Sequence, residues 1–335
     1  MRDDALRLFR DPDSRPVHFV GIAGAGMSAL AELFARRGIT VTGSDMSAAG
    51  NADLTSLGIT VHAGHAAEFV DGARAVVASS AIPADHVEIA AARELGLPII
   101  RRAEALGAAV SGMQIVGIAG THGKTTTTVM TTEALAGTTA APTGIVGGRV
   151  QRWGGNLRWG GGDTVVVEAD EYDRSFLALH PTIAVVTNVE ADHLDIYADL
   201  QDIVATFAAY LAGARGIVLC ADDAGANGLA LPESAEILRY GLDDTNARLV
   251  GVRDGAAMHV IFDAAPLGTL TLQVPGDHNR RNALAALGAG LLLGYAFDDL
   301  RPGLEGFRGV ERRFEPKGEA NGVLVIDDYA HHPTE

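Results

Sequence analysis

The feature that most constrains this fold is a glycine loop placed between a buried strand and a helix. The apolar run QIVGIAG at 114–120 is typical of a strand, and a helix is predicted from 124 to 136. Between them the chain reads GTHGKTT, in which backbone N–H groups can bind phosphate at the start of the helix. Lys124 would reach the β- and γ-phosphates of a nucleotide, and the hydroxyl of Thr125 would bind Mg²⁺. We therefore predict a P-loop-type α/β ATPase domain.

This loop departs from the common Walker A pattern by one position. The pattern GxxxxGK[ST] requires a glycine five residues before Gly123, where Ile118 stands. A glycine- and threonine-rich helix cap without a ligand is the alternative, but the order strand, loop, helix favours phosphate binding. Lysine usage points the same way, because Lys124 and Lys317 are the only two lysines among 26 basic residues.

A second glycine loop lies near the N-terminus, in a segment of alternating strands and helices from about 15 to 108. The pattern GxGxxA from Gly24 to Ala29 stands at a strand-to-helix junction, which is the geometry that binds a diphosphate. Asp45 ends the next strand, where a carboxylate can bond a ribose hydroxyl. A tight turn with a solvated aspartate is the alternative. The phosphate loop near 117 leaves room for little more than one mononucleotide half, which favours a nucleoside diphosphate over NAD.

Acidic residues follow two of the predicted buried strands in the central part of the chain. Mg²⁺ needs hard oxygen ligands near Thr125, and the carboxyl ends of parallel strands line the ligand crevice. Periodicity does not choose among the candidates. These are Glu168, Asp170 and Glu171 after one strand, and Glu190, Asp192 and His193 after the other. A histidine by itself is more often a surface or helix-cap residue than a magnesium ligand.

The remaining chain sets the predicted domain boundaries. We expect an extension at 1–15, a Rossmann-like domain at 16–108, a central ATP-binding domain at 109–318 and a final segment at 319–335. Short alternating strands predict a small antiparallel element at about 248–274 within the central domain. An α/β domain should not stop one strand after it begins. The final segment is therefore expected to be the first strand of a domain that is cut short.

Composition argues against several classes of function. The formal net charge of −16 argues against wrapping a nucleic acid backbone. No apolar run reaches the ~18 residues of a membrane helix, so membrane insertion is not expected. The single cysteine, Cys220, excludes an internal disulfide and suits a reducing cytoplasm.

Taken together, these segments resemble the Mur ligases, the ATP-dependent amide-forming enzymes of peptidoglycan assembly. The similar segments, in the order of that family, are HFVGIAGAGMSALAE, TGSD, SSAI, GTHGKTTTT, EADEYDRSFL, TNVEADHLD, PGDHNRRNALAA, GVERRF and DDYAHHPTE. They cover nearly the whole chain from Val17 onward. The family's loop is GTxGKT, which accounts for Ile118.

The resemblance implies a role for particular residues. It implies Lys124, Glu168 and His193 as catalytic residues, and Thr125, Glu168 and His193 as the Mg²⁺-associated residues. The implied ATP contacts are Gly120, Thr121, His122, Gly123, Lys124, Thr125, Thr126, Asn279, Asn282, Arg313 and Asp327, with Asp328 beside it. The implied contacts of a UDP-sugar are Gly24, Ala25, Gly26, Met27, Ser28, Asp45, Ser79 and Ser80.

Within the family the similarity is greatest to the members that attach L-alanine to the carboxylate of UDP-N-acetylmuramate through an acyl phosphate. Several other members use a carbamylated lysine in the central domain, and no lysine lies between Lys124 and Lys317. The resemblance implies ATP and Mg²⁺ as cofactors, a cytoplasmic location, and a monomer or homodimer. We expect the chain, cut short as it is, to bind nucleotides but to be poorly active. The alternatives are a ligase that recycles a whole tripeptide, a non-catalytic nucleotide-binding protein, and an oxidoreductase that uses the first glycine loop.

Overall fold

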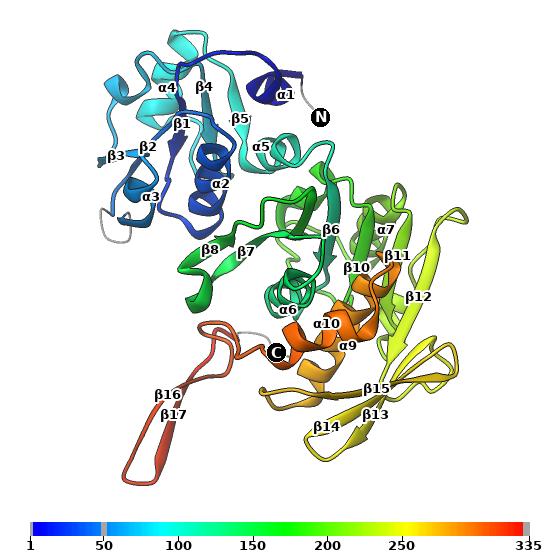
Figure 1. Cartoon of the computed structure of the whole chain (residues 1–335). Coiled ribbons are helices and arrows are strands. Elements are labelled where there is room, and N and C mark those ends of the chain that lie inside the picture. Colours follow the sequence, from blue (N-terminus) through cyan, green and yellow to red (C-terminus); the bar gives the residue numbers. More distant parts are fainter. Residues whose placement is uncertain (1–2, 48–51, 331–335) are drawn as a thin grey trace. The chain divides into compact units, whose positions relative to one another are not determined.

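The computed structural model describes residues 3–47 and 52–330, which form two compact units (Figure 1). The first unit contains residues 1–112 together with 152–157, and the second contains 113–151 and 158–335. The chain first passes from one unit to the other at 112/113, four residues beyond the predicted boundary. The ends of the predicted segments 1–15 and 319–335, at 1–2 and 331–335, lie outside the described residues, as do 48–51 of the first domain.

The first unit is built on a five-stranded parallel sheet. Apolar runs form its central strands β1 and β4, and every residue of these two strands is buried. The strand order is β3-β2-β1-β4-β5, which confirms the predicted Rossmann-like arrangement. The strands are β1 (Val17–Val20), β2 (Val41–Asp45), β3 (Thr60–Ala63), β4 (Ala75–Ala78) and β5 (Ile99–Arg101). The helices are α1 (Asp3–Arg10), α2 (Ala25–Arg36), α3 (Ala52–Ser56), α4 (Val87–Glu94) and α5 (Arg102–Ala109), with a short turn η1 (Ala67–Val70).

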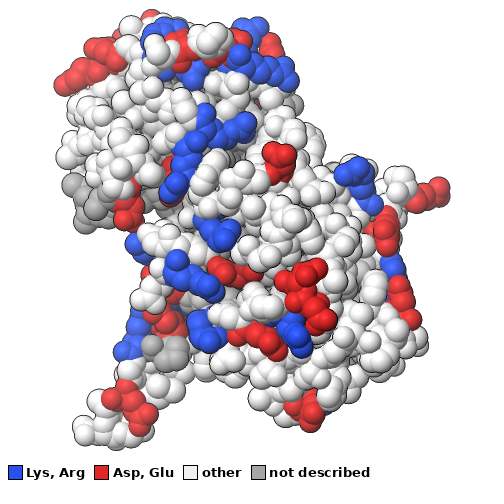
Figure 2. All heavy atoms as spheres, in the orientation of Figure 1, with Lys and Arg blue, Asp and Glu red and all other residues white. Residues whose placement is uncertain are grey.

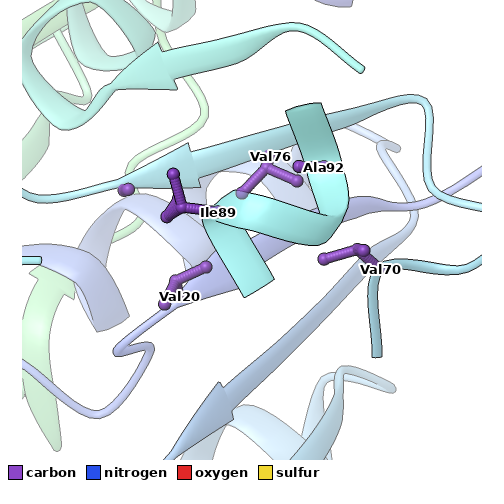
Figure 3. Packing of buried hydrophobic residues seen from close by; sticks show 6 residues of the cluster. Val20, Val70, Val76, Ile89 and Ala92 are labelled. Atoms are coloured by element: carbon purple, nitrogen blue, oxygen red, sulfur yellow. The ribbon is translucent and has the colours of Figure 1, made fainter. Parts of the chain in front are cut away.

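Aliphatic side chains hold α4 against this sheet. Val20 and Val76 come from neighbouring strands, and Ile89 and Ala92 come from the covering helix (Figure 3). Val70 closes the same cluster from η1. All five are buried, so the cluster contributes several kcal/mol of hydrophobic stabilisation, on the order of 1.5–3 kcal/mol for each large aliphatic side chain.

A buried carboxylate lies next to this apolar cluster. Glu88 on α4 is fully buried and accepts hydrogen bonds from His18 Nε2 (3.2 Å), Ser44 Oγ (2.7 Å) and His65 Nδ1 (3.1 Å). Burial by itself would raise the pKa of Glu88, but the hydrogen bonds from His18 and Ser44 outweigh it and lower the pKa from 4.5 to about 2. The charged carboxylate therefore ties α4 to strands β1 and β2.

Replacing Glu88 by glutamine is expected to destabilise the first unit by about 3 kcal/mol, because buried donors lose a charged acceptor. The contribution of Glu88 is present above pH ~4.5 and is lost as the pH falls toward ~2, since the pKa is lower in the folded state. Hydrogen exchange of the β1 amides between pH 3 and 7 measures this loss. Glu94→Gln, at the exposed end of the same helix, is the matched control. An equal effect of both variants would contradict the assignment.

The second unit is built on most of a mixed sheet in the order β15-β14-β13-β12-β11-β10-β6-β9-β7-β8, in which residues 155–157 of β8 belong to the segment grouped with the first unit. Strands β6, β9, β10, β11 and β12 pair in parallel, which confirms an α/β domain of the P-loop type. Strands β13, β14 and β15 are antiparallel to one another and confirm the element predicted at about 248–274. These strands are β6 (Gln114–Ala119), β7 (Thr143–Val150), β8 (Gly155–Arg158), β9 (Thr164–Glu168), β10 (Ile183–Val186), β11 (Gly216–Cys220), β12 (Glu236–Gly241), β13 (Leu249–Asp254), β14 (Ala257–Phe262) and β15 (Ala265–Thr271).

Helices α6, α9 and α10 pack against one another in this unit (Figure 1). The helices are α6 (Lys124–Ala136), α7 (Leu200–Leu211), α8 (Ala224–Asn227), α9 (Asp277–Leu292) and α10 (Phe297–Glu305), with turns η2 (Gln151–Trp153) and η3 (Tyr172–Ala178). The strand predicted near the end of the chain is β17 (Val323–Asp327), which forms an antiparallel hairpin with β16 (Glu315–Ala320).

Charged side chains of both signs occur among uncharged residues on the face drawn in Figure 2. On the face drawn in Figure 2 the basic and acidic groups are interspersed, so the net charge of −16 is not concentrated in one place on that face. Among the described residues, no helix is both long enough and apolar enough to cross a membrane.

Candidate functional site

Two glycines let the loop between β6 and α6 pass close to neighbouring residues. Gly120 and Gly123 adopt left-handed φ angles of +136° and +81°. A Cβ on Gly120 would lie 2.1 Å from Thr187 Oγ1, and a Cβ on Gly123 would lie 2.8 Å from Asn282 Oδ1. These two positions therefore require glycine.

Polar residues after β10 fix the backbone of this loop. His122 N donates to Asn188 Oδ1 (2.7 Å), and Thr187 Oγ1 donates to His122 O (2.6 Å). Thr121 N donates to Asn188 O (3.1 Å). Neither Thr187 nor Asn188 was predicted as a site residue from the sequence. The sequence feature that could have identified them is their position directly after the apolar strand β10. In the structure β10 pairs with β6.

The side chain of Lys124 folds back over the loop. Its Nζ donates to Gly120 O (2.7 Å), Thr121 O (3.1 Å) and Glu171 Oε1 (2.8 Å). Burial raises the pKa of Glu171, and Lys124 opposes that effect. The ion pair is largely shielded from water, because the Lys124 and Glu171 side chains are 13% and 4% exposed.

Thr125 contacts Glu168, the carboxylate that the family resemblance implied beside it. Thr125 Oγ1 donates to Glu168 Oε1 (2.9 Å), and Gly147 N donates to Glu168 Oε2 (2.7 Å). The structure thus divides the acidic run that periodicity left open, with Glu168 at Thr125 and Glu171 at Lys124. Asp170 Oδ1 accepts from Tyr172 N (3.1 Å).

His193 lies on the Lys124 side of the site. Its Nε2 is 3.7 Å from Glu171 Oε1, its Nδ1 is 3.8 Å from Asp192 Oδ1, and its ring meets Tyr172 edge to face. Among the described residues, no three His, Cys, Asp or Glu side chains form a ready metal-binding group. The hydroxyl of Thr125 and the carboxylate of Glu168 are nevertheless the oxygen donors that Mg²⁺ takes. A magnesium ion held by them would need phosphate oxygens and waters to complete its coordination.

A cavity of about 710 Å³ extends from Lys124, Thr125 and Glu168 to α9 and to Asp328 and Tyr329, which follow β17. Its volume is that of a site for a nucleotide-sized ligand. Of the residues predicted to contact ATP, it is lined by Thr121, His122, Gly123, Lys124, Thr125, Thr126, Asn279, Asn282 and Arg313, and also by Glu168 and His193. The predicted residues Gly120 and Asp327 are not part of the lining, while Asp328 is. Asp327 lies 3.8 Å from Lys317 Nζ.

The far wall of the cavity comes from α9. Asn279 and Asn282 are both buried there, and Asn279 Nδ2 donates to Pro275 O (2.7 Å). Burial lowers the pKa of His278, so a neutral ring next to Asn279 is favoured. An adenine could stack or hydrogen-bond against this amide-rich wall.

An aspartate that was not predicted from the sequence, with a side chain that is 6% exposed, supports the same wall. Asp222 accepts hydrogen bonds from Arg281 Nε (2.8 Å) and from the backbone N–H groups of Leu242, Asp243 and Asp244. Asp222 and Arg281 both line the cavity. The available signal was an acidic residue two positions after the apolar strand β11, which ends at Cys220.

In the first unit the other glycine loop begins α2. Gly24 is the N-cap residue of this helix. Ala23 N donates to Asp45 Oδ2 (2.9 Å), so Asp45 fixes the loop backbone. The predicted UDP-sugar residues Gly24, Ala25, Gly26, Met27 and Ser28 lie after β1, Asp45 ends β2, and Ser79 and Ser80 follow β4, so all come from the carboxyl ends of neighbouring parallel strands.

A guanidinium that was not predicted lies beside this loop. A Cβ on Gly26 would be 3.1 Å from Arg102 Nη1, which places a positive group next to the start of α2. Such a loop favours an anionic ligand, since the helix N-terminus and the guanidinium are both positive. The available signal was the pair of arginines at the end of β5.

Comparisons with known proteins match both units. The Mur ligase family, catalytic domain, matches residues 16–113, and the Mur ligase middle domain matches residues 118–290. The UDP-N-acetylmuramate–L-alanine ligase of Salinibacter ruber is 45% identical over 332 residues, which are 96% of this chain and 70% of that protein. The enzyme of the same name from an Arthrobacter species is 47% identical over 329 residues, 95% of this chain and 70% of that protein.

Solved structures show the same similarity. A UDP-N-acetylmuramate–alanine ligase from Thermotoga maritima superposes with a TM-score of 0.84 at 31% identity, covering 96% of this chain and 75% of that chain. The UDP-N-acetylmuramate:L-alanyl-γ-D-glutamyl-meso-diaminopimelate ligase from Neisseria meningitides superposes with a TM-score of 0.80 at 27% identity, covering 90% of this chain and 100% of that chain.

Proposed function

Because this chain belongs to the Mur ligase family, we propose that it carries the machinery for ATP-dependent ligation of L-alanine to the carboxylate of UDP-N-acetylmuramate. The observation that carries the proposal is the cavity in which Lys124, Thr125 and Glu168 meet a nucleotide-sized space. The similarity of 45–47% to alanine-adding enzymes supports alanine as the amino acid. The product would be a peptidoglycan precursor formed in the cytoplasm, by a monomer or a homodimer.

In the proposed reaction the muramate carboxylate attacks the γ-phosphorus of ATP, and ADP leaves. The amine of L-alanine then attacks the acyl phosphate, loses a proton and displaces inorganic phosphate. Lys124 would hold the β- and γ-phosphates, and the loop amides from Thr121 to Thr126 would stabilise their negative charge. Mg²⁺ bound at Thr125 and Glu168 would supply further positive charge at the γ-phosphate. His193 would lie beside the transferred group. A carboxylate and a triphosphate repel each other, so this neutralisation is the main catalytic task.

The first unit is proposed to bind the UDP part of the sugar nucleotide. The diphosphate would sit at the N-terminus of α2, at Gly24 to Ser28, with Arg102 as an additional cation. Asp45, Ser79 and Ser80 would lie near the uridine.

A tripeptide-adding ligase is the second candidate, since one structural relative has that activity in its name. Its identity of 27% is well below that of the alanine-adding relatives. A nucleotide-binding protein without activity and an NAD-dependent oxidoreductase remain the competing functional classes. A thermal shift with UDP and none with NAD would remove the oxidoreductase.

The decisive experiment is phosphate release with ATP, Mg²⁺, UDP-N-acetylmuramate and each candidate amino acid or the tripeptide. We expect release to require the sugar nucleotide and to be fastest with L-alanine. The 335-residue polypeptide spans 70% of the length of the Salinibacter and Arthrobacter relatives, and we expect it to bind both nucleotides. Phosphate release that ignored UDP-N-acetylmuramate would overturn the proposal.

Glu168→Gln is expected to raise the Mg²⁺ concentration needed for nucleotide binding at least tenfold, because a neutral amide replaces the carboxylate at Thr125. Titrating Mg²⁺ at fixed ADP measures the shift, while ADP binding without metal should change little. Asp163→Asn removes a carboxylate just before the other end of β9, where it is exposed, and is the matched control. An unchanged Mg²⁺ requirement in Glu168→Gln would remove this residue from the metal site.

A further inference from the structure

The ammonium group of Lys124 has no donor left for a phosphate. An ammonium has three N–H donors, and Lys124 Nζ has three acceptors at 2.7, 2.8 and 3.1 Å. Two of these acceptors are carbonyls of its own loop, and the third is the Glu171 carboxylate. A phosphate that reaches Lys124 must therefore displace at least one of them.

Glu171 is the acceptor that binds most strongly, because it carries a charge in a place with little water. Glu171 is 3% exposed, and its backbone carbonyl accepts a hydrogen bond from the buried hydroxyl of Tyr197 (2.5 Å). This bond restricts the backbone from which the carboxylate projects. Glu171 is thus a fixed acceptor, unlike a surface carboxylate that water can replace.

The second oxygen of the same carboxylate is unsatisfied. Glu171 Oε2 is buried, and within the described part of the chain it has no hydrogen-bond partner. Besides Lys124, the described residue with an ion-pair contact to this carboxylate is His193, whose Nε2 is 3.7 Å from Oε1. Displacing Lys124 from Glu171 would leave a buried carboxylate beside the more distant His193 ring, which opposes the displacement.

We propose that Glu171 is a positioning residue that retains Lys124 over its loop in the nucleotide-free protein, so that the phosphates of a nucleotide bind by taking Lys124 from Glu171. The exchange sets the affinity of the site for the phosphate tail. This inference rests on the proposed function, since it takes the cavity to be a nucleotide site. It goes further by assigning to Glu171 an effect opposite in sign to that of Lys124, Thr125 and Glu168.

The first test is the affinity for ADP of the Glu171→Gln variant, measured by calorimetry in magnesium-free buffer. Glutamine keeps the size of the side chain and removes the charge that competes with phosphate. We expect ADP to bind about tenfold more tightly than to the wild type, the scale of one charge-assisted hydrogen bond. If Glu171 merely supported the loop, the same variant would bind ADP more weakly.

The control is Asp173→Asn, which removes the same charge two residues away. Asp173 is exposed, outside the cavity lining, and left-handed in backbone conformation, a conformation that asparagine accepts. Its affinity for ADP is expected to stay within twofold of the wild type. Glu171→Asp retains the charge on a shorter side chain and is expected to bind ADP with intermediate affinity.

The second test uses the two lysines of the chain. Protein labelled with ¹⁵N at the lysine side chains has two Nζ signals, one from Lys124 and one from the exposed hairpin residue Lys317. In the wild type without nucleotide, the Lys124 ammonium hydrogens should exchange slowly with water, and in Glu171→Gln they should exchange faster. ADP should shift the Lys124 signal alone, and the shifted position should be the same in both proteins.

Each outcome decides between the claims. A wild type that binds no ADP, with or without UDP, overturns the proposed function and this inference with it. A wild type that binds ADP, together with a Glu171→Gln variant that binds it equally or more weakly, overturns the inference and leaves the proposed function standing. If Glu171→Gln does not fold, the test uses two other measurements. These are the ADP affinity of Glu171→Asp and the hydrogen-exchange rate of the Lys124 ammonium group in the wild type. Fast exchange at Lys124 without nucleotide contradicts retention by Glu171.

Discussion

Lys124→Met is expected to bind ADP about 100-fold more weakly than the wild type and to release phosphate at least 10³-fold more slowly. Methionine has a similar length but carries no charge and no N–H donor, so the β- and γ-phosphates lose their only side-chain ammonium in the cavity lining. Removing a donor aimed at developing charge in a low-dielectric site typically costs 10²–10³ in rate, and the charge adds to that cost. Calorimetry with ADP and a phosphate-release assay measure the two effects.

Lys317→Met is the matched control for this prediction. Lys317 lies on β16, is 44% exposed and pairs with Glu315 at 2.8 Å. Its loss should leave ADP affinity unchanged. Affinity for UDP should also be unchanged in both variants, because the first unit carries the proposed UDP site. Equal losses of ADP affinity in the two lysine variants would show that overall charge, and not the loop, controls binding.

The ion pair with Glu171 adds a stability effect to the same experiment. Lys124→Met leaves the Glu171 carboxylate buried without its cation, which is expected to cost about 3 kcal/mol. The double variant Lys124→Met with Glu171→Gln should recover most of that stability and none of the ADP affinity. Stability and binding can therefore be separated by one additional substitution.

The strands and glycine loops could be predicted because their signals are local. An apolar run such as that of β6, followed by Gly120 and Lys124, specifies strand, turn and helix within about twenty residues. The same order of strand, loop and helix predicted the parallel sheet of the first unit. The antiparallel strands β13 to β15 were predicted from short strand-like runs of alternating residues separated by turn residues.

The partners of the site residues could not be predicted, because they depend on contacts between distant segments. Glu168 and Glu171 are three residues apart, yet they contact different residues of the loop, since the chain leaves the strand after Glu168 and enters η3. Within η3, Asp173 and Arg174 have left-handed backbone conformations. No periodicity describes such a segment, so the resemblance to a family was needed to prefer Glu168 as the magnesium residue.

The sequence also does not show which oxygens of a candidate carboxylate already accept hydrogen bonds from the backbone. Asp45 was expected to be available to a ribose hydroxyl, but its Oδ2 and Oδ1 accept from Ala23 N and Ser47 N, both at 2.9 Å. Each carboxylate oxygen has a second lone pair, with which Asp45 can accept a hydrogen bond from a ribose hydroxyl in the proposed function. The sequence alone did not show that the loop after β1 packs against the end of β2, where Ala23 N donates to Asp45.

Gly120→Ala is expected to destabilise the second unit by about 2–5 kcal/mol and to abolish measurable ADP binding. Alanine at φ +136° is strained, which costs on the order of 1–3 kcal/mol. Its Cβ would also lie 2.1 Å from Thr187 Oγ1. The backbone nitrogens of Thr187 and Asn188 would be 3.0 and 3.1 Å from the same Cβ. Backbone atoms of a buried strand end cannot move aside cheaply, so the loop must shift instead.

That shift would break the contacts that aim the loop at a phosphate. Thr187 and Asn188 hold the backbone of His122, and the carbonyl of Gly120 is an acceptor for Lys124. Gly137→Ala at the other end of α6 is the matched control, because Gly137 has a helical φ of −82° and a Cβ there would come no closer than 3.9 Å to Asp299 O. Thermal unfolding and ADP calorimetry of the two variants give the comparison. Full ADP affinity in Gly120→Ala would mean that the loop can bind phosphate in a second conformation, and that the fixed geometry set by β10 is not what the site requires.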